Sequence, residues 1–400
     1  MTFISENLKK IKPSPTMAIT AKARELKLRG ENVISLSSGE PDFDTPDNIK
    51  DAAIKAINQG YTKYTNVEGI PELKESIVRK FKNDNFIDYE ADEVIVGVGG
   101  KQILFNALFA TLNPNDEVII PTPYWVSYPD MTLLAGGIPK FLNCRIENDF
   151  KINADDLDKT ISKNTKWLIL NSPSNPSGSC YTKKELEDLA NVLREHKSVN
   201  VMTDDIYEYI VYDDFNFFTL AQVAPDLKER ILTVNGVSKS YCMTGWRIGY
   251  AAGRKDLIKA MIKIQGQSTS NPSSISQYAA LAGINGDRGF LTPCLEAFDK
   301  RRKLVVNELN SIEGIECIMP KGAFYAYPNV QGLLGRITKN GKTLINDTDV
   351  TEWLLEDAKV AAVPGVAFGL EPFFRVSYAT SYEILEEALN NIKDSVNTLK

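Results

Sequence analysis

The chain has 400 residues, 43% of them hydrophobic and 24% charged, and a formal net charge of −6 with acidic and basic residues interspersed. These values are typical of a globular protein with two or three domains, and the absence of a basic cluster argues against nucleic acid as a partner. There is no 18-residue apolar run and no signal-peptide core, so we expect no membrane partner either.

The cysteines and the single histidine restrict the chemistry further. No C-x-x-C pair occurs among the five cysteines, so we expect neither a zinc site nor a disulfide framework, and a reducing, cytoplasmic compartment. His196 stands alone at the end of a polar helix pattern, which argues against a multi-histidine metal site and a Ser-His-Asp hydrolase. If the protein is an enzyme, lysine is the leading candidate for carrying protons.

Short β-branched runs alternate with amphipathic helical patterns through the middle of the chain, which predicts an α/β fold with a mostly parallel sheet. We expect strands at 93–98, 117–121, 166–170, 199–203, 231–235 and 247–252, and helices at 101–112 and 183–194. Thr182 and Glu185 form a capping box for the second of these helices.

Polar or aromatic residues recur just beyond these strands. They are Gly99-Gly100, Trp125, Asn175, Asp204 and Lys239. Ligands of open α/β sheets bind outside the carboxyl ends of the strands, so the pattern predicts one shared site.

The pattern changes past residue 290. A helix at 298–309, strands at 322–327 and 373–378, and a terminal helix opened by Thr380 and Glu383 are expected there. We therefore predict an N-terminal segment at 1–45 that packs with the small domain, a large domain at 46–290, and a small α+β domain at 291–400.

The most informative stretch runs from Gly236 through Lys239 to Gly249. A lysine can form a Schiff base with an aldehyde cofactor and later carry a proton, and Arg247 can pair with a phosphate. An isolated Ser-Lys pair is more often a basic loop, but the full run predicts a pyridoxal phosphate site.

The ordered motifs, from Ser38-Gly39-Glu40-Pro41 to Arg375, resemble the class I pyridoxal-phosphate-dependent aminotransferases of the aspartate aminotransferase superfamily. The resemblance covers essentially the whole chain. It implies the fold-type-I transferase fold, pyridoxal 5′-phosphate as cofactor, amino acids and 2-oxo acids as substrates, and a homodimer with shared active sites.

The resemblance assigns three residues to catalysis. Lys239 resembles the Schiff-base lysine, and burial and nearby cations must lower its pKa for it to act as a base. Asp204 would pair with the protonated pyridine nitrogen, which keeps the ring an electron sink, and Tyr207 would donate to the phenolic oxygen of the cofactor. Asp205 is an alternative candidate for this role, but the spacing to Tyr207 favours Asp204. The structural alternative is that the aspartate is buried and only caps the next turn.

Two further residues resemble those that hold the cofactor ring. Asn175 would bond the cofactor oxygen near the substrate carboxylate, with a cis bond expected before Pro176. Trp125 would stack on the pyridine ring, and a tryptophan of the hydrophobic core is the competing interpretation.

The phosphate is expected at a helix start. Gly99, Gly100 and Lys101 offer free N–H groups there, and Arg247 would add a bidentate charge pair. Tyr64 resembles the tyrosine that reaches the phosphate of the neighbouring subunit. Family members carry serine where this chain has Gly236, so one phosphate contact is missing or is supplied by Ser238.

The substrate residues follow from the same resemblance. Arg375 would bind the α-carboxylate, unless it is an outward-facing strand arginine, and Gly39 would line the substrate. No arginine stands at 267–272 to bind a distal carboxylate, and Lys101 matches a lysine that does so in a bacterial subgroup. Lys12 resembles a lysine associated with prephenate there, with a solvated surface lysine as the alternative.

These residues predict an aminotransferase that moves the amino group of L-aspartate to 2-oxoglutarate by a ping-pong cycle, with prephenate as an open second acceptor. The alternatives are an aminotransferase for aromatic or branched amino acids, a lyase on the same scaffold, or a non-enzymatic regulator. A nucleotide-binding oxidoreductase lacks support because no G-x-G-x-x-G follows a strand.

Overall fold

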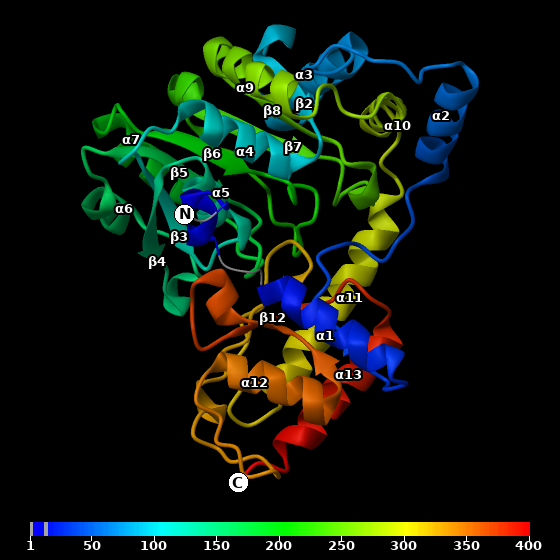
Figure 1. Cartoon of the computed structure of the whole chain (residues 1–400), viewed down its shortest axis with the longest axis vertical. Coiled ribbons are helices and arrows are strands. Elements are labelled where there is room, and N and C mark those ends of the chain that lie inside the picture. The colour runs from blue at the N-terminus through cyan, green and yellow to red at the C-terminus, as the bar shows by residue number, and fades with distance from the viewer. Residues whose placement is uncertain (1–2, 12–14) are drawn as a thin grey trace.

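The computed structural model describes residues 3–11 and 15–400, which form two bodies of unequal size (Figure 1). The larger body contains a seven-stranded sheet, and helix α11 (Leu291–Asn310) runs from it into the smaller body. Helix α1 (Pro15–Leu28) lies against the smaller body, although it is close to the N-terminus in sequence.

The large sheet has the strand order β2-β8-β7-β6-β5-β3-β4, and the mostly parallel α/β fold is confirmed. Only β8 runs antiparallel to its two neighbours. The carboxyl ends of β2, β5, β6 and β7 therefore meet at one edge of the sheet. The strands are β2 (Val94–Gly97), β3 (Glu117–Thr122), β4 (Ile138–Asn143), β5 (Thr165–Asn171), β6 (Asn200–Asp204), β7 (Ile231–Gly236) and β8 (Gly249–Ala252).

Both faces of this sheet are buried, which explains the nearly continuous apolar runs of its strands. In β5, Trp167 and Ile169 belong to one core, while Leu168 and Leu170 belong to the core on the opposite face. The helices of this body are α2 (Asp47–Asn58), α3 (Pro71–Asn85), α4 (Gly100–Thr111), α5 (Ser127–Leu134), α6 (Ala154–Thr160), α7 (Lys183–Glu195), α8 (Leu220–Val223), α9 (Lys255–Ser268) and α10 (Ser274–Asn285).

The smaller body is built around an antiparallel sheet of order β11-β12-β9. Its elements are β9 (Tyr325–Ala326), β10 (Val360–Ala361), β11 (Val363–Pro364), β12 (Phe374–Ser377), α12 (Asp347–Trp353) and α13 (Tyr382–Val396). Strand β1 (Ile34–Ser35) pairs in parallel with β10, and Glu31 forms an ion pair with Lys359. These contacts hold the N-terminal segment on this body.

Of the two helix caps predicted from the sequence, one is confirmed and the other lies one residue further along the chain. The box of Thr182 and Glu185 is present at the start of α7, as predicted. The cap predicted at Thr380 is wrong, because Ser381 caps α13 by accepting from the backbone N–H of Ile384 at 3.3 Å. A hydroxyl caps a helix only from the last extended residue, and here that residue is Ser381.

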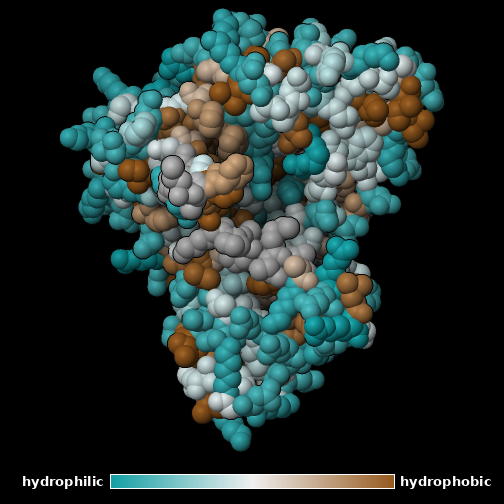
Figure 2. Space-filling model, viewed as in Figure 1, coloured by the Kyte–Doolittle hydropathy of each residue, from teal (hydrophilic) through white to brown (hydrophobic). Residues whose placement is uncertain are grey.

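The face of the molecule shown in Figure 2 is mostly hydrophilic, with apolar residues scattered over it, and it is hollowed between the two bodies. Across residues 3–11 and 15–400, no helix is both long and apolar enough to cross a bilayer.

Candidate active site

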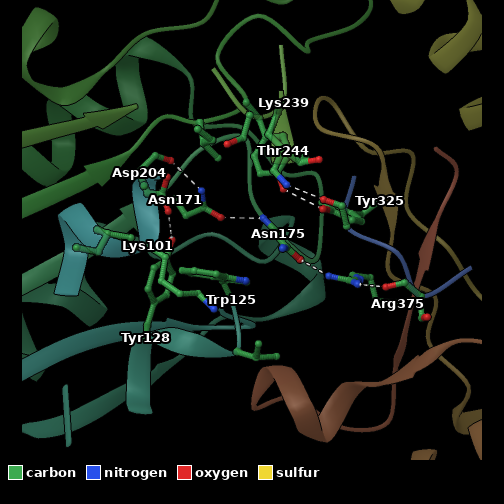
Figure 3. A pocket seen from close by; sticks show the side chains of 18 of the residues that line it. Lys101, Trp125, Tyr128, Asn171, Asn175, Asp204, Lys239, Thr244, Tyr325 and Arg375 are labelled. Carbon is green, nitrogen blue, oxygen red and sulfur yellow. Dashed lines mark hydrogen bonds between the residues drawn. The ribbon is translucent and has the colours of Figure 1, made fainter. Parts of the chain in front are cut away.

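One cavity lies at the carboxyl edge of the large sheet, where the small body closes over it (Figure 3). Strand ends supply Asp204 and the segments that follow them supply Asn175 and Lys239, while Arg375 comes from β12 of the small body. The predicted site residues that line the cavity are Gly39, Gly100, Lys101, Trp125, Asn175, Asp204, Tyr207, Ser238, Lys239, Arg247 and Arg375.

Three predicted residues stand apart from this lining. Gly99 immediately precedes α4 and is not in the lining, and a Cβ on it would approach Arg247 Nη2 to 2.6 Å. Tyr64 is 91% exposed and does not line the cavity of its own chain. Lys12 lies outside the described residues.

The lining carries an excess of positive charge. Lys101, Lys239, Arg247 and Arg375 face the cavity, and Asp204 is the only carboxylate among the described lining residues. A cavity of this kind favours ligands with several negative charges.

Lys239 follows β7, and its ammonium donates to the carbonyl of Gly39 at 2.6 Å. Burial and the positive charge of Arg375 lower the pKa of Lys239 to about 8, although Glu40 opposes the shift. At pH 7 roughly one tenth of this amine is therefore uncharged, far more than for an ordinary lysine, so Lys239 can attack an aldehyde.

Asp204 ends β6 with its buried carboxylate in the cavity. Burial raises the pKa of Asp204, while the Tyr128 hydroxyl, which donates to Oδ2 at 2.7 Å, acts in the opposite direction. The neighbouring Asp205 does not line the cavity, and its Oδ2 accepts from the Thr203 hydroxyl at 3.3 Å instead. The geometry thus favours Asp204 over Asp205 as the carboxylate that serves the site, a choice that the sequence alone does not settle.

Two phenols from different bodies meet in the lining of the cavity. The hydroxyls of Tyr207 and Tyr325 lie 2.9 Å apart, and both residues are buried. A Cβ on Gly39 would come within 3.2 Å of the Tyr325 hydroxyl, so glycine permits this approach. Tyr325 is a site residue that the sequence analysis missed, since its motif indicates only a strand.

Arg375 is 4% exposed and has no acidic partner in the described part of the chain. Its Nη1 donates to Asn175 Oδ1 at 2.9 Å, its Nη2 donates to the carbonyl of Ser37 at 2.7 Å, and Nε has no partner. Arg375 therefore points inward and not outward, and a buried guanidinium with an orphan N–H is ready to bind a carboxylate.

Lys101 occupies the first turn of α4, with Nζ 4.9 Å from the ring centre of Trp125. Burial and the charge of Arg247 lower the pKa of Lys101. Within residues 3–11 and 15–400 it has no acidic partner, so a second cation stands free beside an aromatic face.

The remaining cavity wall suits a phosphate. Gly99, at φ +82°, precedes α4, and the first N–H groups of this helix are free of helical partners. Arg247 donates to the Thr244 carbonyl at 2.9 Å and pairs with no described acid, and Ser238 also lines the cavity. Helix N-termini next to a guanidinium are typical phosphate sites.

Seven further lining residues were not predicted from the sequence, and these are Ser37, Leu104, Val126, Tyr128, Asn171, Ile206 and Thr244. Asn171 could have been predicted as a site residue, because it directly follows the strand expected at 166–170. Its amide donates to the Asp204 carbonyl at 2.8 Å. Thr244 lies inside the run from Gly236 to Gly249, and Ile206 lies between Asp204 and Tyr207, but neither was assigned a role. The other four lie within helices, a turn or the N-terminal segment, where no local pattern marks them.

These residues fit pyridoxal phosphate as a set. A carboxylate for the ring nitrogen, an amine of lowered pKa for the aldehyde, and a helix start with an arginine for the phosphate share one cavity. The fold and the cavity together define a pyridoxal-phosphate enzyme of the α/β class.

Comparison of the chain with known proteins supports its assignment to this class of enzyme. The family model of aminotransferase class I and II matches residues 31–392. A probable aspartate/prephenate aminotransferase of Rickettsia felis is 58% identical over 399 residues, covering 100% of this chain and 98% of its own. The structure of the aspartate aminotransferase from Rhizobium meliloti has a TM-score of 0.98 at 50% identity, with full coverage of both chains. The aspartate aminotransferase from Thermus thermophilus with maleate has a TM-score of 0.92 at 41% identity, covering 99% of this chain and 100% of its own.

The chain belongs to the class I and II aminotransferases, and its cofactor is pyridoxal 5′-phosphate. The family, the fold and the cofactor inferred from the sequence are thereby confirmed.

Proposed function

We propose that the protein moves the amino group of L-aspartate to 2-oxoglutarate, giving oxaloacetate and L-glutamate. The observation that carries this proposal is that Arg375 and Lys101 lie in one cavity and have no acidic partner among the described residues. Figure 3 shows Arg375 on the opposite side of Asn175 from Lys101, so a substrate with two carboxylates has one cation for each.

The names of the relatives support the same substrate class. Aspartate is named for the relatives from Rickettsia, Rhizobium and Thermus, and maleate, in the Thermus structure, is a dicarboxylate. Prephenate, named for the Rickettsia relative, also carries two carboxylates, and we propose it as a second amino acceptor. The proposed contribution of Lys12 to prephenate binding lies outside the described residues.

Each cavity residue then has a defined task. The bound cofactor supplies an electron sink when the substrate Cα loses its proton. Asp204 would pair with the ring nitrogen, Tyr207 and Asn175 would bond the ring oxygen, and Trp125 would cover the ring face. Lys239 Nζ takes the proton from the substrate Cα and carries it, for which a pKa of about 8 suits it.

Separate groups of the cavity bind the substrate and the phosphate, although Lys101 directly follows Gly100 in the first turn of α4. Arg375 binds the α-carboxylate, Lys101 the distal carboxylate, and Gly39 lines the substrate. Gly99, Gly100, Ser238 and Arg247 hold the phosphate. The same groups serve both halves of a ping-pong cycle, first with the amino acid and then with the oxo acid.

The alternatives receive less support. An aminotransferase for aromatic or branched amino acids would leave Lys101 without a carboxylate to bind, and none of the reported relatives bears such a name. A non-enzymatic regulator would not need the cation-rich cavity, where Lys239, Asp204 and Arg375 are all in place.

We also propose that two copies of the chain form a homodimer with shared active sites. Tyr64 supports this, because a phenol 91% exposed and outside its own cavity is free to reach the phosphate of the partner. Sedimentation should then give twice the chain mass of 44.5 kDa.

We further propose a cytoplasmic location, supported by five cysteines that are all unbridged.

The proposed division into a segment at 1–45 and domains at 46–290 and 291–400 is supported by the cores. One core combines Ile34 and Leu36 with residues from Cys294 to Val396, and joins them to a few residues of the large body near Tyr207. The cores of the large sheet contain no described residue beyond Ala280 among their fully buried members.

The visible absorption spectrum of the purified protein tests the proposed function. We expect the band of the lysine-bound cofactor to decrease when L-aspartate is added and to return on addition of 2-oxoglutarate. A coloured protein that ignores aspartate but responds to phenylalanine would contradict the substrate proposal and leave the family unchanged.

Replacing Lys101 with serine should lower kcat/KM for aspartate by about 10- to 100-fold, because one charged hydrogen bond to the substrate is lost. The value for phenylalanine should stay within about threefold, since it has no distal carboxylate. Steady-state kinetics on both donors measures the difference. Equal losses for the two donors would exclude a role for Lys101 in reading the distal carboxylate.

A further inference from the structure

Tyr128 lines the cavity but has no role in the reaction described above. It is the second residue of α5, is 2% exposed, and packs edge-on against Trp125 with ring centres 5.4 Å apart. Its hydroxyl donates to Asp204 Oδ2 at 2.7 Å (Figure 3). In the described part of the chain, this phenol is the only side chain that donates to the Asp204 carboxylate.

Asp204 depends on that donor because no cation among the described residues bonds its carboxylate directly. Lys239 acts on Asp204 only through space, and the backbone N–H of Ile206 is the other group that bonds the carboxylate. The remaining titratable neighbours, Tyr207 and Asp205, bring no positive charge. A buried carboxylate left with an unpaired oxygen tends to take up a proton, and a protonated Asp204 could not pair with a cationic ring nitrogen.

A phenol suits this position better than a charged group. Burial raises the pKa of Tyr128 well above its ordinary value, so the hydroxyl remains a donor at physiological pH. A lysine or arginine here would compete with the ring nitrogen for the negative charge of Asp204. A neutral donor fixes one carboxylate oxygen and leaves the full charge for the cofactor.

We propose that Tyr128 is a positioning residue that keeps Asp204 ionised and oriented toward the pyridine nitrogen. Tyr128 thereby sets the strength of the contact that makes the ring an electron sink. This inference rests on the proposed pairing of Asp204 with the ring nitrogen and extends it to a residue that never touches the substrate.

The test is Tyr128→Phe, which keeps the ring that packs against Trp125 and removes only the hydroxyl. The apoprotein should bind pyridoxal phosphate about 10- to 100-fold more weakly, the range expected for one hydrogen bond to a charged group. The midpoint of the pH titration of the bound cofactor's visible band should also move upward by at least ~0.5 pH unit. The reason is that a ring nitrogen without its proton no longer withdraws charge from the nitrogen of Lys239.

Tyr89→Phe is the matched control. Tyr89 is also buried, at 4% exposed, but its hydroxyl bonds the Thr233 hydroxyl at 3.2 Å and does not line the cavity. It should leave both cofactor affinity and titration midpoint unchanged. Equal shifts in the two phenylalanine variants would show a general effect of losing a buried hydroxyl, and would overturn the proposal.

Asp204→Asn separates this inference from the function on which it rests. If Asp204→Asn shifts both readouts and Tyr128→Phe adds nothing in the Asp204→Asn background, the two residues act as one unit and the proposal holds. If Asp204→Asn shifts them but Tyr128→Phe alone does not, only the role of Tyr128 falls. If Asp204→Asn shifts neither, the proposed ring-nitrogen contact falls, and the role of Tyr128 with it.

Discussion

Replacing Lys239 with alanine is expected to lower kcat for aspartate transamination by at least ~10⁴-fold. The variant loses the amine that holds the cofactor aldehyde and the base that moves the proton at Cα. The other cations of the cavity cannot substitute, because two of them are arginines, whose side chains do not act as bases in proteins, and Lys101 points toward Trp125. Single-turnover absorbance with L-aspartate measures the chemical step apart from product release.

A surface lysine provides the control for this variant. Lys140 pairs with Glu117 at 3.0 Å outside the cavity, so Lys140→Ala should keep kcat within about twofold. Retention of more than about one hundredth of wild-type kcat by Lys239→Ala would contradict a catalytic role for Lys239. Far-UV circular dichroism of both variants distinguishes loss of chemistry from loss of fold.

Replacing Arg375 with glutamine should lower kcat/KM by roughly 10³-fold for aspartate and for phenylalanine alike. Two charged hydrogen bonds to the α-carboxylate are lost, which corresponds to about 4 kcal/mol. Because every amino acid has an α-carboxylate, the loss does not depend on the side chain of the donor. Steady-state kinetics with both donors checks this result and contrasts it with the selective loss expected for Lys101→Ser.

Arg336 is a matched arginine outside the cavity, where its Nη2 lies 3.4 Å from Glu313. Arg336→Gln should leave both kcat/KM values within about twofold. A selective loss for aspartate in Arg375→Gln would mean that Arg375 reads the distal carboxylate, and the proposed orientation of the substrate would then be reversed.

Much of the large body could be predicted from local patterns. Its strands are buried on both faces, so each reads as a short apolar run, and five of the predicted strands match β2, β3, β5, β6 and β7 to within two residues at each end. The strand expected at 247–252 begins later, at Gly249, because Arg247 adopts a left-handed conformation with φ +58°. The cis bond expected before Pro176 is present.

The site was predictable where a motif surrounds the residue and not elsewhere. Lys239, Asp204 and Asn175 each follow a strand, in or next to polar or glycine-rich segments, which marks them in the sequence. Tyr128 and Tyr325 have no such mark, because a tyrosine in a helix or strand is usually a core residue. Their part in the site depends on hydroxyl contacts with Asp204 and Tyr207, over separations of 76 and 118 residues.

The sequence by itself determined the class of enzyme and the cofactor, because an amine, a carboxylate and phosphate-binding groups are required by the chemistry and stand in recognisable motifs. Only the tertiary structure decided which groups are left without partners. Arg375 and Asn175 are 200 residues apart, and their contact depends on how the small body packs against the large one. Charge neutralisation is a property of neighbours in space, so the two free cations that define the proposed substrate exist only in the folded chain.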